Sequence, residues 1–268
     1  MNTVVFDLDD TLLHDDLTIS DYTVTVLRRL YDKGFHIIAA SGRAFLSMKP
    51  FVEQIACVSL CISCNGAEIR DASSGSMLFS EMLPVETAKA IALFAEEHNC
   101  YAQVYDSGSF FFNKRGIYAQ RYASTSKLSG VFIGKLSDYI REPRNKILLI
   151  DDESRIASMY TVASVMFSGK AAVTCSKPYF LEFNPPDTSK GKALEKVTAL
   201  LGTSCKDAVV FGDSLNDVSM LQKAGLSVAV ANGWESVRSG CDAVCGSNNQ
   251  DGPAHFLADR FLSGEVIL

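Results

Sequence analysis

The chain has 268 residues and a mass of 29.1 kDa, which at about 150 residues per domain predicts one or two domains. Charged residues make up 21% and hydrophobic residues 47%, and this balance excludes a disordered, collagen-like or low-complexity chain. The 25 basic and 31 acidic side chains give a net charge of −6. We therefore do not expect nucleic acid as a partner, because binding to phosphates needs clustered lysine and arginine.

The first residues and the cysteines indicate in which cellular compartment the protein is located. Acidic residues begin at position 7, where a secretory signal would have a basic start and an apolar core. No stretch approaches the ~20 apolar residues of a membrane span, so we expect a cytoplasmic protein that does not contact a membrane. Cys61 and Cys64 have metal-like spacing, but no second pair follows. Reduced, mostly buried thiols are the preferred interpretation of the eight cysteines, and zinc is the alternative.

Apolar runs and helical spacing predict the elements in chain order. Buried strands are expected over 4–8, 35–41 and 58–62, separated by a helix that starts after Ser20 and ends at Gly34, and by a second helix to about residue 56. Asn65-Gly66 is the preferred two-residue type I′ turn, so a hairpin is expected over 61–71. Near the end of the chain, a helix over 189–201, a strand over 207–213, a short helix over 216–224 and a strand over 227–230 are predicted.

The middle of the chain has a different pattern. A helix over 85–98 precedes strands 101–105 and 109–113, and after a strand at 146–151 a helix over 153–167 precedes strands 171–175 and 179–183. This repeated order of helix, strand and strand indicates an α+β module, whereas both chain ends predict a doubly wound parallel sheet. We expect a core formed by residues 1–80 and 186–268, with residues 81–185 inserted as a lid.

Polar residues follow three of the buried strands. They are Asp7 and Asp9, then Ser41-Gly42-Arg43, and finally the segment 213–217, which contains Asp213 and Asp217. The carboxyl ends of parallel strands line one crevice, and several carboxylates there repel one another unless a divalent cation is bound. Oxygen ligands favour Mg²⁺ over zinc. The alternative is that Asp7 and Asp9 are simple turn residues at a strand end.

These residues carry a resemblance to a known family. The segment 7–11, DLDDT, resembles the DxDxT first motif of the haloacid-dehalogenase-like (HAD) superfamily. Ser41-Gly42-Arg43 resembles its second motif, Ser189-Lys190-Gly191 its third, and the segment 212–218, GDSLNDV, its fourth. The segment 247–255 is similar to the SNxxDG signature of the Cof-type sugar-phosphatase branch. The resemblance spans the chain and implies a Rossmann-like doubly wound core with an inserted α+β lid, a type C2B cap.

The resemblance also implies a role for each residue. Asp7 would be the nucleophile that forms an aspartyl-phosphate, and Asp9 would be the general acid and then the general base. Mg²⁺ would be held by Asp7, the main-chain carbonyl of Asp9, and Asp213, with support from Asp217. The residues expected to contact the phosphoryl group or substrate are Leu8, Ser41, Gly42, Arg43, Lys190 and Asn216. A solvated surface arginine is the alternative at Arg43, and Asn65-Gly66 is either a plain turn or a segment near the substrate.

Two positions depart from the pattern of the branch. Position 10 is aspartate where the Cof branch usually has glycine, and the segment 230–233, VANG, differs from its usual Gly-Asn-Ala, which weakens any role for Asn232.

The leading hypothesis is a Mg²⁺-dependent phosphatase, a monomer or homodimer, acting on a small phosphorylated metabolite such as a sugar phosphate. A phosphomutase or a sucrose- or trehalose-phosphate phosphatase is one alternative, and a non-catalytic phosphometabolite-binding regulatory protein is the other.

Overall fold

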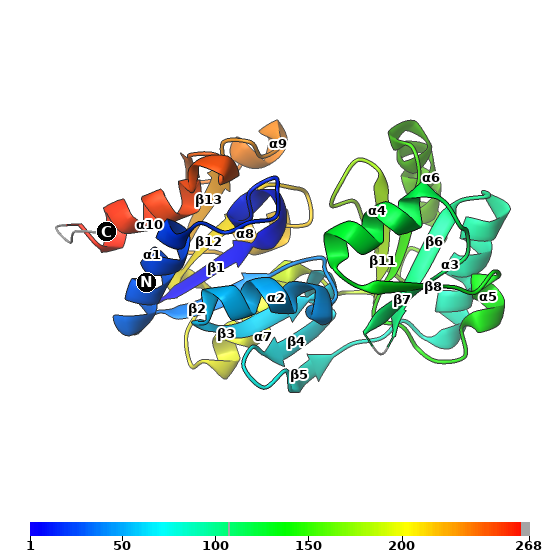
Figure 1. Ribbon diagram of the computed structural model, residues 1–268, viewed down its shortest axis with the longest axis horizontal. Helices are drawn as coiled ribbons and strands as arrows, with labels where there is room; N and C mark the ends of the chain where they lie inside the picture. The colour runs from blue at the N-terminus through cyan, green and yellow to red at the C-terminus, as the bar shows by residue number, and fades with distance from the viewer. Residues whose placement is uncertain (107, 264–268) are drawn as a thin grey trace. The chain divides into compact units, whose positions relative to one another are not determined.

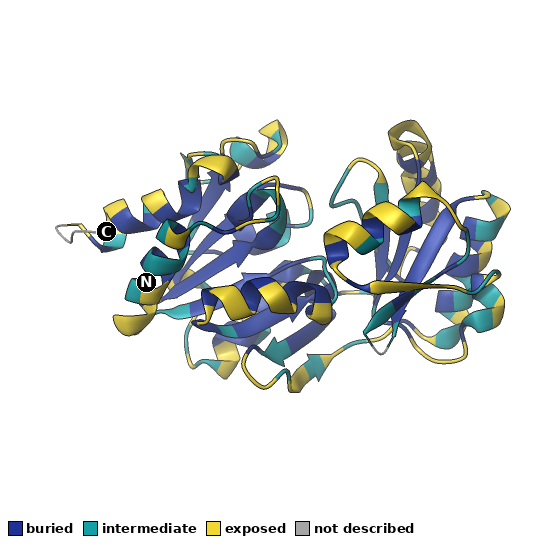
Figure 2. Cartoon of the chain, viewed as in Figure 1, coloured by how far each residue is buried: buried dark blue, intermediate teal, exposed yellow. Residues whose placement is uncertain are grey.

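The computed structural model describes residues 1–106 and 108–263, and the chain divides into two compact units. Unit 1 consists of Met1–Leu78 and Ser189–Leu268, and unit 2 is the intervening segment Phe79–Thr188. Within the described residues no helix is both long enough and apolar enough to cross a membrane. In Figure 2 the strands of each unit are mostly buried, while the outward faces of the helices are exposed.

Unit 1 contains an eight-stranded sheet (Figure 1). In spatial order its strands are β14 (Ala243–Cys245), β13 (Leu226–Val230), β12 (Ala208–Gly212), β1 (Thr3–Asp7), β2 (His36–Ala40), β3 (Val58–Ser63), β4 (Glu68–Asp71) and β5 (Met77–Ser80). The strands from β14 to β3 pair in parallel, and β4 is antiparallel to β3. The predicted hairpin is confirmed, because the Ala67 amide donates to the Cys64 carbonyl (3.1 Å) around Asn65-Gly66.

Helices cover both faces of this sheet. They are α1 (Asp21–Asp32), α2 (Phe45–Ile55), α7 (Lys190–Leu200), α8 (Val218–Leu221), α9 (Glu235–Arg238) and α10 (Gly252–Phe261). Val4 and Phe6 of β1 pack with α1, α2 and α10, whereas α7 packs with α8 and against β3. The alternation of side chains along a strand thus supplies two apolar layers, one on each face. The predicted Rossmann-like α/β core is confirmed.

The N-terminus of α1 is capped as the sequence predicts. Ser20 is the predicted N-cap of α1, and its Oγ accepts from the Thr23 amide (3.0 Å). The helix predicted over 216–224 is shorter, because residues 213–217 form a turn in which the Asp217 amide donates to the Ser214 carbonyl (3.0 Å).

Unit 2 contains a six-stranded sheet. Its strands in spatial order are β10 (Ala172–Thr174), β11 (Phe180–Asn184), β9 (Ile147–Ile150), β6 (Tyr101–Asp106), β7 (Ser109–Phe112) and β8 (Ser129–Phe132). Its helices are α3 (Val85–Glu97), α4 (Ile117–Ser126), α5 (Leu136–Tyr139) and α6 (Glu153–Met166). The twice-repeated order of helix and two strands is present as predicted, while α4, β8 and α5 were not predicted.

The two faces of the sheet in unit 2 differ. One face packs against α3, α5 and α6 through an apolar cluster that includes Val104 and Leu149. The residues that alternate with this cluster include a buried polar chain, in which the Tyr101 hydroxyl donates to Gln103 (2.7 Å) and Gln103 donates to the Tyr105 hydroxyl (2.9 Å). Lys146 and Glu182 form a buried ion pair. Unit 2 therefore has one apolar face and one face with buried polar groups.

A close backbone approach fixes β13 beside β12. The Gly225 amide donates to the carbonyls of Cys205 (3.0 Å) and Ala208 (3.1 Å), and a Cβ at Gly225 would lie 1.9 Å from the Lys206 carbonyl oxygen. We expect Gly225→Ala to lower the free energy of unfolding by about 1–3 kcal/mol, because backbone must shift to admit the methyl group. The midpoint of urea unfolding measures this loss. The matched control is Gly240→Ala, whose Cβ would meet no atom closer than 3.6 Å, and equal midpoints for the two variants would contradict the expectation.

Candidate active site

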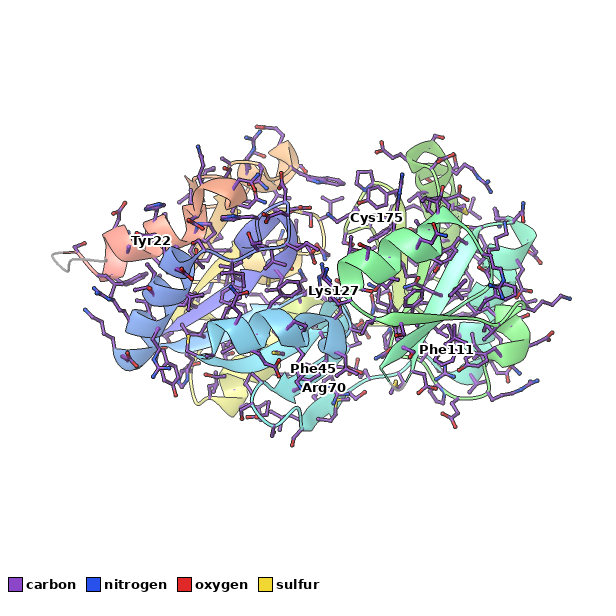
Figure 3. The ribbon with its side chains drawn as sticks, viewed as in Figure 1. Tyr22, Phe45, Arg70, Phe111, Lys127 and Cys175 are labelled. Atoms are coloured by element: carbon purple, nitrogen blue, oxygen red, sulfur yellow. The ribbon has the colours of Figure 1, made fainter. Side chains whose placement is uncertain are left out.

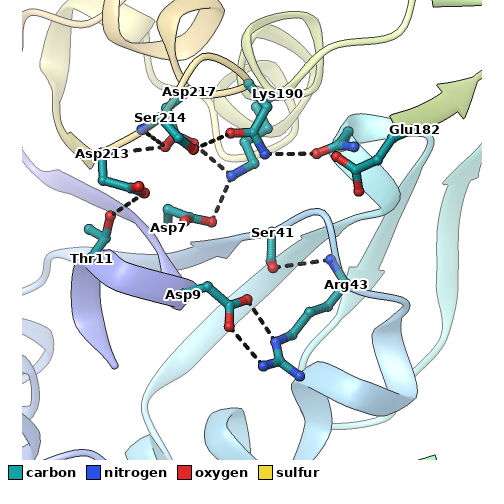
Figure 4. Close-up of polar contacts among 12 residues, drawn as sticks. Asp7, Asp9, Thr11, Ser41, Arg43, Glu182, Lys190, Asp213, Ser214 and Asp217 are labelled. Carbon is teal, nitrogen blue, oxygen red and sulfur yellow. Dashed lines mark hydrogen bonds and ion pairs between the residues drawn. The ribbon is translucent and has the colours of Figure 1, made fainter. Parts of the chain in front are cut away.

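Three acidic side chains meet at the carboxyl ends of the central strands of unit 1. Asp7 is the last residue of β1, and Asp213 follows β12, which pairs with β1 in register. Together with Asp217, these residues each place a carboxylate oxygen within 4.8 Å of the others, and all three are buried. The predicted convergence of residues about 200 positions apart is thus observed (Figure 4).

Lys190 lies between two of these carboxylates. Its Nζ donates to Asp7 Oδ1 and to Asp217 Oδ1, both at 2.6 Å, and the side chain is fully buried. Burial alone would lower the pKa of the ammonium, but the Asp217 and Asp7 carboxylates outweigh it and raise the pKa. Lys190 is therefore charged, although it is the first residue of α7, where the helix dipole disfavours a cation.

Asp217 is held by the backbone as well as by Lys190. Its Oδ2 accepts from the amides of Asp213 (3.0 Å) and Ser214 (3.2 Å). Gly212 permits this close packing, because a Cβ there would lie 2.6 Å from Asp217 Cβ. Both oxygens of Asp217 are thus engaged, and the residue fixes the turn that presents Asp213.

Asp213 has a different environment. Its Oδ1 accepts from the Thr11 hydroxyl (3.1 Å), and among the described residues no cationic side chain forms an ion pair with it. Burial, reinforced by the charges of Asp217, Asp7 and Asp10, raises the pKa of Asp213 to about 9. Burial also raises the pKa of Asp7, against the opposing effect of Lys190. A further cation is therefore needed for both Asp7 and Asp213 to be ionised at neutral pH.

Asp9 is turned away from this cluster. Arg43 Nε donates to Asp9 Oδ2 (2.8 Å) and Arg43 Nη2 to Asp9 Oδ1 (2.7 Å), so the pair is bidentate. Arg43 is further held by Ser47, which accepts from Nη1 (2.8 Å), and by the ring of Phe51. The solvated alternative for Arg43 is therefore wrong, since its side chain is only 10% exposed.

The other predicted site residues lie around the same strand ends. Leu8 is buried directly after Asp7, and Ser41, 1% exposed, follows β2 with its Oγ accepting from the Arg43 amide (3.1 Å). Gly42 lies between Ser41 and Arg43 and is partly exposed. Asn216 is partly exposed and lies in the turn with Asp213, where its Oδ1 accepts from the Ser214 hydroxyl (2.7 Å).

Two residues that contact the site were not among the predicted site residues. Thr11 lies in the first motif and donates to Asp213. Asn65, 3% exposed, accepts from Asn216 Nδ2 (3.0 Å), so the β3–β4 turn reaches the same strand ends. The signal for Asn65 was the Asn-Gly dipeptide, and both residues have the left-handed backbone that the pair favours, with φ of 54° and 100°.

A cation–π contact lies at the edge of this region. The guanidinium of Arg70 on β4 lies over the Phe45 ring at the start of α2, 5.2 Å from its centroid (Figure 3). This contact joins the antiparallel hairpin to the helix that begins just after Arg43.

The donor set fits a divalent cation that prefers oxygen. The acidic residues Asp7, Asp9, Asp213 and Asp217 supply up to four negative charges, and Lys190 and Arg43 supply two positive charges. A divalent ion would balance the remaining charge, and carboxylate oxygens suit Mg²⁺. Among the described residues, Asp7, Asp213 and Asp217 form the group of possible metal ligands, and the zinc alternative at Cys61 and Cys64 finds no support.

Comparisons with known proteins agree with this geometry. The sequence model of the haloacid dehalogenase-like hydrolases matches residues 4–257. A 5-amino-6-(5-phospho-D-ribitylamino)uracil phosphatase of Bacillus subtilis is 26% identical, covering 96% of this chain and 97% of that protein. An HMP-PP phosphatase of Cronobacter sakazakii is 29% identical, covering 94% and 93%. The crystal structure of a haloacid dehalogenase-like hydrolase from Bacteroides thetaiotaomicron has a TM-score of 0.87 at 26% identity, covering 97% and 99%.

The chain therefore belongs to the haloacid dehalogenase-like hydrolase family. Within that family it is a Cof-type enzyme, a phosphatase, as its motifs predicted.

The raised pKa of Asp213 has a consequence for stability. An unfolded aspartate, with a pKa of 3.8, loses its proton at a pH where the folded Asp213, with a pKa of about 9, retains it. Between these values the folded state binds more protons, so the stability of the metal-free protein falls as the pH rises. Asp213→Asn keeps the acceptor for Thr11 without the charge. At about pH 8 in excess chelator we expect its Tm to exceed that of the wild type by roughly 5 °C.

The difference should disappear near pH 3, where residue 213 is mostly uncharged in the folded and the unfolded states of both proteins. Asp16→Asn is the control, because exposed Asp16 accepts from the Thr18 amide and hydroxyl through Oδ1, an atom that asparagine retains. A Tm for Asp213→Asn at or below that of the wild type at both pH values would refute the expectation.

Proposed function

We propose that this phosphatase is Mg²⁺-dependent and hydrolyses a small phosphate ester, a sugar phosphate or related metabolite, through an aspartyl-phosphate on Asp7. The observation that carries the proposal is the buried cluster in which Lys190 bridges Asp7 and Asp217, while in the part of the chain that the structure describes no cationic side chain forms an ion pair with Asp213. A dianionic substrate would be repelled by the excess carboxylates, so a cation must accompany it. When bound, Mg²⁺ would be held by Asp7, Asp213 and the main-chain carbonyl of Asp9, with support from Asp217, and would supply Lewis-acid stabilisation of negative charge.

The chain's own residues account for the steps. Asp7 Oδ attacks phosphorus, and the bond from phosphorus to the ester oxygen breaks. Asp9 gives its proton to the departing alcohol and later takes a proton from the water that attacks the aspartyl-phosphate. In the structure Arg43 binds both oxygens of the Asp9 carboxylate, so Asp9 must release Arg43 and take up a proton from solvent before it acts as the acid. The water attacks phosphorus, the bond from phosphorus to the Asp7 oxygen breaks, inorganic phosphate is released and the Asp7 carboxylate is regenerated.

Donors around Asp7 would hold the phosphoryl oxygens. Lys190 supplies an ammonium, Ser41 a hydroxyl and Asn216 an amide, while Leu8 and Gly42 supply main-chain amides. Such donors stabilise a transition state whose charge spreads over three equatorial oxygens, and they need no reorganisation because packing already fixes them.

The substrate class is proposed more broadly than any one relative suggests. The two curated relatives are 26% and 29% identical to the chain and carry different substrates in their names. Similarity of this degree selects neither compound, although both names denote phosphatases of small metabolites. We assign unit 2 the role of a lid that excludes water and chooses the leaving group, and we place the enzyme in the cytoplasm, where such metabolites occur.

The nucleophile can be tested with a panel of phosphate esters. We expect Asp7→Asn to lower turnover by more than about 1000-fold, because the amide cannot form the acyl-phosphate. Release of inorganic phosphate measures turnover, and it also separates hydrolysis from the phosphomutase alternative, which would give an isomeric ester. Asp16→Asn, the same change on an exposed loop, should behave as the wild type. Equal rates for Asp7→Asn and the wild type would remove Asp7 from the mechanism.

The cation requirement is tested separately. We expect excess EDTA to abolish turnover and added Mg²⁺ to restore it, because the cluster cannot accept a dianion without a compensating cation. Undiminished phosphate release in excess EDTA would exclude the proposed metal dependence. A chain that binds phosphate esters without hydrolysing any of them, with Mg²⁺ present, would instead favour the regulatory alternative.

A further inference from the structure

The loop that carries Asp9 has an unusual backbone. Residues Leu8–Leu12 form one wide turn, closed by a hydrogen bond from the Leu13 amide to the Leu8 carbonyl (2.8 Å). Within it Asp9 is extended, whereas Asp10 is left-handed with φ of 58° and ψ of 4°. The left-handed region is unfavourable for most residues other than glycine, although aspartate adopts it more readily than most. The loop therefore needs contacts from outside to keep this shape.

Asn232 makes one such contact from a distant part of the chain. Its Nδ2 donates to the main-chain carbonyl of Asp10 (2.7 Å), the carbonyl of the strained peptide. Its Oδ1 accepts from the Asn248 amide (2.9 Å), so both ends of the Asn232 amide are engaged. The orientation of the peptide that follows Asp10 is thereby set from residue 232.

Asn248 continues this support on the other side of the loop. Its side chain is 1% exposed, and Nδ2 donates to the Leu13 carbonyl and to Asp15 Oδ1, both at 3.0 Å. The segment that contains Asn248 is itself fixed to α1, because Asp251 accepts from Ser20 (2.8 Å) and Thr23 (3.1 Å). In addition, the ring of Tyr22 on α1 (Figure 3) lies 4.5 Å from that of His255 on α10.

The segment around Asn232 also holds the loop of Asp213. The Trp234 amide donates to the Asp213 carbonyl (2.9 Å), and Gly233 packs so closely that a Cβ would lie 3.0 Å from the same oxygen. Residues 232–234 thus contact the backbone of both acidic loops. Neither contact involves a catalytic side chain, and both fix where those side chains are presented.

We infer that Asn232 is a positioning residue for the general acid: by holding the Asp10 carbonyl it sets the position of Asp9 relative to Asp7 and the loop of Asp213. This inference rests on the proposed function, in which Asp9 protonates the leaving alcohol. The consequence is specific, because loss of the contact should impair proton delivery more than phosphate binding. The substitution should therefore reduce kcat for poor leaving groups, which need the acid, and spare good leaving groups, which do not.

The test uses Asn232→Asp in the full-length protein. Aspartate has the same shape and still accepts from Asn248, but it cannot donate to the Asp10 carbonyl. The matched control is Asn249→Asp, which adds the same charge to an exposed asparagine and keeps the acceptor that Asn249 Oδ1 offers the Asp15 amide (3.0 Å). Asn232→Ala is the second variant, because it removes the contact without adding charge. Thermal unfolding of each variant shows whether it is folded.

The readout is the leaving-group dependence of turnover. For an alkyl phosphate from the panel we expect Asn232→Asp to lower kcat roughly tenfold, with KM within about twofold. For p-nitrophenyl phosphate we expect a loss below about threefold, and Asn249→Asp should match the wild type with both esters. A merely structural role would lower the two rates equally or only the Tm.

Asp9→Asn, measured in parallel, separates this inference from the proposed function. If Asp9→Asn selectively lowers kcat for the alkyl ester and neither Asn232 variant does so, the inference is overturned while the general-acid assignment of Asp9 stands. If Asp9→Asn lowers kcat equally for both esters, the general-acid assignment of Asp9 fails, and the positioning role of Asn232 fails with it. Equal losses for Asn232→Asp and Asn249→Asp would also overturn the inference, since added charge alone would then explain them.

Discussion

Three buried carboxylates that lie close together, with one ammonium between two of them, form the constraint on which the rest of the structure depends. Such a group repels itself, and burial strengthens the repulsion because water no longer screens it. The protein holds it together with backbone groups: amides of the 213–214 turn bind Asp217, and Lys190 is fully enclosed between two acids. The remaining repulsion lies at the candidate active site, where a bound divalent cation would offset it.

The parts of the fold that were predictable are those whose signals are local. The buried strands β1, β2 and β12 are short apolar runs that need only their own residues to be recognised, and the Ser20 cap lies next to the helix it starts. In unit 2 the elements α4, β8 and α5 escaped prediction because their patterns are weak. All four residues of β8 are exposed, and α5 has a single turn. Such elements are stabilised by contacts with neighbouring elements, which a local sequence pattern does not reveal.

The same distinction applies to the site. The aspartates and Lys190 are recognisable because their motifs each combine several functional groups at the end of an element. The pairing of Asp9 with Arg43 was not, because it depends on the rotamers that two adjacent loops permit. The contact made by Asn232 escaped prediction for a related reason. Its partner is a main-chain carbonyl 222 positions away, and a carbonyl has no signature in the sequence.

The interleaving of the two units also bears on how the protein forms during synthesis. Unit 2 is one continuous segment, so all its strands are available once residue 188 has left the ribosome. By contrast, β1 waits for β12, whose Ala208 pairs with Thr3, and until then the central strand of unit 1 has an open edge. Asp7 is made 183 residues before Lys190. The nascent chain therefore carries Asp7 long before its partner Lys190, and the buried cluster can assemble only after Asp217 has been made.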